Sequence, residues 1–163
     1  SRLAQDGVTV IAGRPCFRDP DLADLANKQG NGAALARGYE LYAEDIFTRL
    51  TGAFCCAIID TNADRVLLAT DRLGQHSVYY RAGDDSLAFG NSASATLVGS
   101  EPEVQLLNQG VFNYLYFHMI PSPGTVYRGV NKLPSAHYLD YQGGQTRLVN
   151  YWCPQFTEFT GRR

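Results

Sequence analysis

The chain has 163 residues, with 14 basic and 16 acidic side chains and a hydrophobic content of 45%, which is enough for one compact domain with its own core. The net charge of −2 gives no electrostatic attraction to nucleic acid or to an anionic membrane, and no run of about eighteen apolar residues predicts a membrane span. The first seven residues contain no apolar core of a signal peptide. We therefore expect a cytoplasmic domain with neither nucleic acid nor membrane as a partner.

The four cysteines form no C-x-x-C pair, and no histidine stands at ligand spacing from any of them: Cys16, Cys55, Cys56 and Cys153. Cys55 and Cys56 are neighbours in a predicted strand, so their side chains point to opposite faces and are interpreted as small core residues. We expect no zinc or other metal site, no cofactor and no disulfide framework.

The first third of the chain predicts one strand and then helices. Val8–Ala12 is short and β-branched and is followed by Gly13, a pattern typical of a strand. Asp19 is a candidate N-cap and Pro20 a candidate first helical residue, so a helix is predicted over 20–29. A second helix is predicted over 33–43, with a further helical turn over 44–50.

The middle of the chain predicts an antiparallel hairpin. Ala53–Ile59 is apolar at every position, which is typical of a strand buried on both faces. Thr61–Asp64 has the composition of a turn, and Arg65–Thr70 returns as the second strand. Because both faces of the first strand need cover, helices should lie against the sheet and the fold class should be a layered α+β domain.

The remaining predicted strands are shorter. Two of them form a hairpin around Gly83–Asp85, and two lie near the C-terminus, the last ending before a Gly143-Gly144 turn. Their ranges are 77–81, 86–89, 126–130 and 136–140. A helix is predicted over 106–116, available to cover an outer face.

Two stretches are specific enough to indicate a family. The run TGAFCCAIID at Thr51–Asp60, continued by RVLLATDRLGQHSVYY at Arg65–Tyr80, resembles the class II, N-terminal-nucleophile glutamine amidotransferase domain of asparagine synthetases. Asn113–Leu139 resembles a later part of the same domain, and Tyr151-Trp152 its end. The resemblance implies a four-layer αββα sandwich with antiparallel sheets. It also implies a domain over residues 1–156 that lacks the usual first third, followed by a linker or tail over 157–163.

The resemblance places a glutamine pocket at two positions, and both depart from the family pattern. Ala12-Gly13-Arg14 stands where the family has N-G-E, whose asparagine and glycine stabilise the oxyanion; the glycine is kept, but the side-chain donor is replaced by a methyl group. Asn31 stands where an aspartate binds the substrate ammonium, which removes a charge-assisted hydrogen bond. The predicted substrate-binding residues are therefore Gly13 and Asn31, in a degenerate pocket.

No catalytic residue is predicted. The family's nucleophile is an N-terminal cysteine whose own amino group is the base, and Ser1 lies too close to the strand at Val8 to take that place. Asp71-Arg72 is interpreted as a hinge salt bridge between strands. The three histidines, His76, His118 and His137, are interpreted as surface or core residues.

Four hypotheses about function remain open. In the first, the chain is the amidotransferase-like domain of an asparagine-synthetase-like protein and is inactive by itself, with an ATP-binding synthetase domain as its partner. In the second, the domain is a non-catalytic scaffold or regulator that docks on such a synthetase. In the third, the parent protein carries the thiol upstream. In the fourth, the domain is a binding module unrelated to glutamine. An exposed sheet edge would in addition favour a homodimer.

Overall fold

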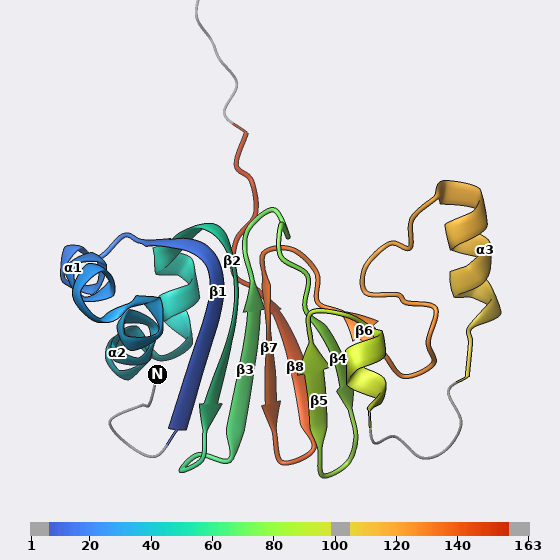
Figure 1. The fold of residues 1–163 in the computed structure, drawn as a ribbon, viewed down its shortest axis with the longest axis horizontal. Coiled ribbons are helices and arrows are strands. Elements are labelled where there is room, and N and C mark those ends of the chain that lie inside the picture. The colour runs from blue at the N-terminus through green and yellow to red at the C-terminus, as the bar shows by residue number, and fades with distance from the viewer. Residues whose placement is uncertain (1–6, 99–104, 157–163) are drawn as a thin grey trace, which may run out of the picture.

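Two antiparallel sheets form the centre of the molecule, and helices lie against the outer face of the larger one (Figure 1). The computed structural model describes residues 7–98 and 105–156, so Ser1 and the predicted linker at 157–163 lie outside the described residues. Within the described ranges, no helix is long and apolar enough to cross a membrane.

The larger sheet has five strands in the order β1-β2-β3-β7-β8. Every neighbouring pair is antiparallel, and β1 and β2 remain in register along their whole length. The strands are β1 (Gly7–Phe17), β2 (Leu50–Asp60), β3 (Arg65–Thr70), β7 (His137–Gln142) and β8 (Gln145–Asn150). Two of the predicted hairpins lie in this sheet, at Thr61–Asp64 and Gly143-Gly144, and both are confirmed.

Strand β1 is longer than the sequence predicts. Gly13 does not end it; with a φ of 96° the glycine bends the strand, which continues to Phe17. Pro15 is tolerated there because β1 is an edge strand, where a missing N–H removes no hydrogen bond from the interior of the sheet.

The smaller sheet has three strands in the order β5-β4-β6: β4 (Tyr79–Ala82), β5 (Leu87–Gly90) and β6 (Asn131–Lys132). The strand predicted over 126–130 is wrong. Only Tyr127 forms an isolated bridge there, to Leu106, and pairing with β4 begins at Asn131. The reason is a local turn, because the Thr125 hydroxyl accepts from the Tyr127 N–H and donates to the Val130 carbonyl.

Three helical segments precede β2: α1 (Pro20–Gln29), α2 (Asn31–Tyr42) and the 3-10 helix η1 (Ala43–Arg49). The predicted cap is confirmed, because the Asp19 carboxylate accepts from the N–H groups of Asp21 and Leu22. Helix α2 begins at Asn31 rather than at 33, since Gly30, with a φ of 91°, is enough to separate the two helices.

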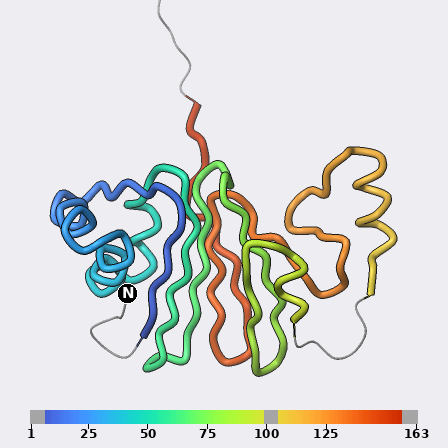
Figure 2. Tube along the Cα trace, viewed as in Figure 1, coloured from blue at the N-terminus to red at the C-terminus, as the bar shows by residue number. Residues whose placement is uncertain are grey.

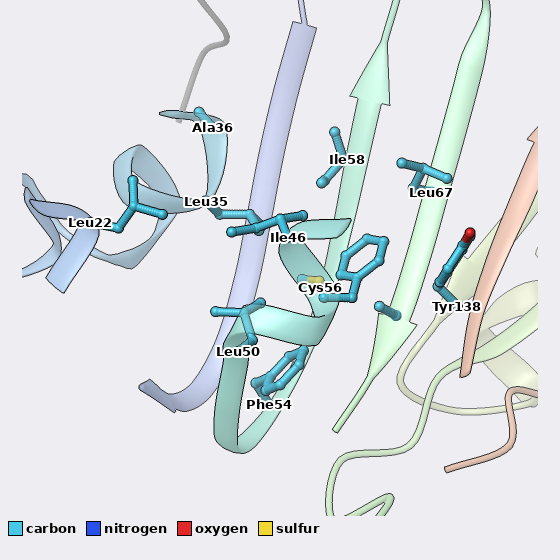
Figure 3. Close-up of a cluster of buried hydrophobic side chains, with 12 residues drawn as sticks. Leu22, Leu35, Ala36, Ile46, Leu50, Phe54, Cys56, Ile58, Leu67 and Tyr138 are labelled. Carbon is cyan, nitrogen blue, oxygen red and sulfur yellow. The ribbon is translucent and has the colours of Figure 1, made fainter. Parts of the chain in front are cut away.

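The main core lies between these helices and the larger sheet. Figure 3 shows Leu35, Ile46 and Phe54 among the side chains that converge there. On the other face of β2, Ala57 belongs to a second buried cluster that includes Val78, just ahead of β4, and Tyr80 of the smaller sheet. The predicted burial of β2 on both faces is therefore confirmed, with Cys56 buried and Cys55 half-buried.

The α+β sandwich with antiparallel sheets is confirmed by this arrangement. The helix predicted over 106–116 is α3 (Asn108–Phe117). It stands apart from both sheets (Figures 1 and 2). The short 3-10 helix η2 (Ser94–Leu97) follows β5. The large apolar side chains of α3 are exposed: Val111, Phe112, Tyr114, Leu115, Tyr116 and Phe117.

An ion-pair network ties the helices to the sheet. Arg65 of β3 donates from Nε to Asp140 of β7 at 2.8 Å and from a terminal nitrogen to Glu44 of η1 at 3.1 Å. Arg147 of β8 also donates to Asp140, at 2.9 Å. Hydrogen bonds from Arg65 lower the pKa of both Asp140 and Glu44. Because each carboxyl has a lower pKa in the folded chain than in the unfolded one, the network stabilises the fold above the unfolded-state pKa.

Arg65→Met should therefore lower the free energy of unfolding at pH 7 by about 3 kcal/mol, because it leaves the buried Asp140 with only its more exposed partner, Arg147. The difference from the wild type should shrink below about pH 4, as falling pH protonates the two carboxylates. Urea unfolding at several pH values measures both effects. The matched control is Arg37→Met, which removes an exposed pair with Glu40 and should cost about 0.5 kcal/mol. Equal losses in the two variants would contradict the proposed role of Arg65.

Candidate functional site

The three residues predicted at the altered pocket lie together on β1, and all three are exposed: Ala12, Gly13 and Arg14. Gly13 is required by its surroundings. A Cβ at this position would collide with the Ala53 carbonyl oxygen and would lie 2.7 Å from Nε2 of His76. Its φ of 96° is also one that side chains other than glycine rarely adopt. The backbone at Gly13 is thus held between β2 and the loop that carries His76.

His76 is a residue of this site that the sequence interpretation missed. The absence of a carboxylate or cysteine at a suggestive spacing favours a surface or core residue, yet the His76 ring lies against Gly13. The contact joins residues far apart in the sequence, so no local pattern could have indicated it. The DRLGQH run offers one indication of this contact, because its first residue shapes the loop on which His76 lies.

That residue is Asp71. The residue is 1% exposed. Its carboxylate accepts four backbone N–H groups, those of Phe54 at 3.3 Å, Leu73 at 2.9 Å, Gln75 at 3.0 Å and His76 at 3.3 Å. A buried carboxylate needs such partners because burial without them is very costly. The Asp71 side chain therefore binds β2 at Phe54, next to the point where the pairing of β2 with β3 stops, and shapes the loop that brings His76 to Gly13.

The hinge salt bridge predicted between Asp71 and Arg72 is wrong. The Asp71 oxygens accept backbone N–H groups, and within the described ranges no ion pair joins the two side chains. The Arg72 guanidinium lies instead over the Trp152 ring, 5.2 Å from its centroid, and donates weakly to the Thr48 carbonyl at 3.5 Å. Arg72 and Trp152 both line a hollow of about 270 Å³ beside Gly52.

Asn31 does not belong to β1 and lies near another part of that strand than Gly13. It is the first residue of α2, and the carbonyl of the next residue, Gly32, accepts from the Thr9 hydroxyl at 2.9 Å. Thr9 precedes Gly13 by four residues, which is about 13 Å along a strand. A molecule that touched both predicted pocket residues would have to span much of that distance.

The two thiols within the sheets are poor nucleophiles. Burial, together with the charge of Asp71, raises the pKa of Cys55. Complete burial raises the pKa of Cys56 far above its ordinary value. Since the thiolate is the reactive form, both side chains stay protonated and inert near neutral pH. In the part of the chain that the structure describes, no three His, Cys, Asp or Glu side chains gather as a metal site.

Comparison with known proteins identifies relatives of this chain. A family model described as a glutamine amidotransferase domain matches residues 26–152. Asparagine synthetase [glutamine-hydrolyzing] 3 of Bacillus subtilis is 25% identical over 155 residues, which cover 90% of this chain and 25% of that protein. A putative asparagine synthetase [glutamine-hydrolyzing] of Mycobacterium tuberculosis is 25% identical over 134 residues, covering 78% of this chain and 20% of that protein. The chain thus spans a quarter or less of these relatives.

A solved structure has a similar fold. Glutamine phosphoribosylpyrophosphate amidotransferase from B. subtilis, complexed with ADP and GMP, superposes with a TM-score of 0.56 over 94% of this chain and 31% of that one. Its sequence is 11% identical, so the likeness concerns the fold alone.

Asp71→Asn should lower the free energy of unfolding by about 2–3 kcal/mol, because the new amide loses the charge and turns an N–H donor toward N–H donors. Chemical denaturation measures the change. Asp85→Asn, an exposed carboxylate in the turn between β4 and β5, is the matched control and should be nearly neutral. If the two variants were equally stable, the Asp71 carboxylate would not organise the loop.

Proposed function

Because the chain belongs to the glutamine amidotransferase domain family, we propose that it is the amidotransferase-like domain of an asparagine-synthetase-like protein and does not itself hydrolyse glutamine. The relatives' names state a glutamine-hydrolysing synthetase activity, and most of their length lies outside the matched region. The partner proposed for this domain is accordingly an ATP-binding, amide-forming synthetase domain, and the proposed compartment is the cytoplasm.

Ala12 carries the proposal of inactivity. It precedes Gly13 in the exposed middle of β1, where the resemblance implies an asparagine side chain that donates to the oxyanion. A methyl group cannot donate, and losing one such donor typically costs two to three orders of magnitude in turnover. The Gly13 N–H alone would remain to stabilise the negative charge that develops on the substrate oxygen.

The groups needed for substrate binding and for nucleophilic attack support the same proposal. At the start of α2, Asn31 offers a neutral amide where a carboxylate would hold the substrate ammonium. The thiols of Cys55 and Cys56 are protonated and belong to the sheet, so neither replaces an N-terminal nucleophile that uses its own amino group as base. At Asn31 the substrate ammonium would lack its carboxylate partner, and neither Cys55 nor Cys56 would serve as the nucleophile.

The scaffold hypothesis has one observation in its favour. From Gln105 to Tyr127 the sequence contains no Asp, Glu, Lys or Arg, and α3 within this segment exposes aromatic and aliphatic side chains. An uncharged apolar surface of this kind is typical of protein–protein contacts. A synthetase domain docked on α3 would give the domain a role that needs no glutamine.

The third hypothesis, an upstream thiol in the parent protein, requires a particular coding sequence ahead of Ser1. A Cys-Gly-Ile sequence at the mature N-terminus, encoded ahead of Ser1, would supply both the nucleophile and its base. Reading those codons separates this hypothesis from the scaffold.

The purified chain should release no ammonia from glutamine above the buffer background. A coupled assay with glutamate dehydrogenase measures the release, and an added glutaminase shows that the assay responds. Gly13→Ala is the matched control, since a Cβ there disrupts the β1 backbone without touching a contaminating enzyme. Ammonia release that saturates with glutamine and disappears in Gly13→Ala would contradict the proposed inactivity.

A further inference from the structure

One ring contact orients the segment that follows β8. The Tyr151 hydroxyl donates to the Thr70 carbonyl at 2.6 Å, which fixes the start of this segment to the end of β3. Among the described residues, no hydrogen bond involves 152–156. What remains to orient this segment is the Trp152 ring, whose centroid lies 5.2 Å from the guanidinium carbon of Arg72.

The Arg72 side chain meets this ring with one nitrogen unsatisfied. Its Nε is buried and, within the part of the chain that the structure describes, has no hydrogen-bond acceptor. A terminal nitrogen reaches the Thr48 carbonyl at 3.5 Å, the limit of a hydrogen bond. A buried donor without an acceptor has lost its water and gained no partner, which opposes the contact. Attraction between the cation and the ring favours it, and the two contributions are of comparable size.

The Trp152 ring also has room to move. It is half-buried and borders the hollow of about 270 Å³ beside Gly52. A second hollow, of about 640 Å³, is lined by Trp152 with its neighbours and Gln155. A side chain in a close-packed core has one position, because any other collides with its neighbours. Trp152 borders open space instead, so its ring can leave Arg72 without displacing the core.

Arg72 belongs to the loop that supports Gly13. It follows Asp71, whose carboxylate accepts the N–H groups of Gln75 at 3.0 Å and His76 at 3.3 Å. The His76 ring in turn lies against Gly13. Arg72 lies between Asp71 and these residues in the chain. A guanidinium held against the Trp152 ring therefore restrains the backbone that positions His76.

We propose that Trp152 is a conformational switch that couples the position of residues 152–156 to the loop beside Gly13. In one state the ring lies on Arg72 and the loop is restrained. In the other the segment has moved away, water reaches the Arg72 Nε, and the loop gains freedom up to His76. A two-state element of this kind is what coupling between distant parts of a protein requires. The switch does not depend on whether the domain hydrolyses glutamine.

Trp152→Ala imitates the released state and tests the proposal. Exchange of the Arg72 Nε proton with solvent, measured by NMR, should become at least about tenfold faster, because water then reaches it. The amides of Gln75 and His76 should exchange at least about threefold faster, while amides in the centre of β2 keep their rates. The Nε proton of Arg81 donates to the Thr96 carbonyl at 3.2 Å, so its exchange should not change.

Two further variants separate the switch from a loss of packing. Phe156→Ala alters the same segment at a side chain that is 91% exposed, and it should leave the loop amides unchanged. Trp152→Phe keeps a ring with a weaker attraction for cations, so it should accelerate exchange less than Trp152→Ala. Circular dichroism checks that each variant is folded.

Coupling must also act in the reverse direction. Trp152 is the single tryptophan of the chain, so its fluorescence reports on this ring alone. His76→Ala loosens the loop and should make the fluorescence easier to quench with acrylamide. Unchanged quenching in His76→Ala, unchanged exchange of the Arg72 Nε proton in Trp152→Ala, or equal acceleration by Phe156→Ala would overturn the proposal. Acceleration that extends equally to the centre of β2 would overturn it too.

Discussion

The buried carboxylate of Asp71 is the interaction on which the arrangement of this domain depends. It follows the last residue of β3, accepts the N–H of Phe54 from β2, and accepts the N–H groups of the loop that follows it. Its own carbonyl accepts from Ala136, just ahead of β7. One side chain and its backbone thus connect three strands of the larger sheet. A carboxylate with only one or two of these partners would be too costly to bury.

The loop fixed by Asp71 sets the geometry around Gly13. The His76 ring and the Ala53 carbonyl both lie so close to this glycine that no Cβ fits there. This packing supports the positive φ of Gly13 within β1. The framework of an amidotransferase domain therefore does not depend on the residues at the two proposed pocket positions, Ala12 and Asn31. Core packing and site chemistry are separate constraints.

The sequence predicts well where the physical cause is local. The unbroken apolar run at Ala53–Ile59 indicates burial on both faces, and the structure places helices on one side and the smaller sheet on the other. Asp19 and Pro20 mark the start of α1 because capping acts within one turn. Prediction fails where the cause is distant. Strand β1 continues past Gly13 because β2 pairs with it as far as Phe17. The salt bridge assigned to Asp71 fails because its partners are backbone groups, which no side-chain pattern reveals.

Amide hydrogen exchange measures the role of Asp71 most directly. The chain provides a comparison, because the Asp60 carboxylate accepts the N–H groups of Asn62 and Ala63 in an exposed turn. If the buried carboxylate of Asp71 fixes the loop, the amides of Leu73 and Gln75 should exchange as slowly as those in the centre of β2 and far more slowly than Asn62 and Ala63. Exchange of Leu73 and Gln75 at the rate of the Asp60 turn would contradict this role, and with it the proposed support of Gly13 by the loop.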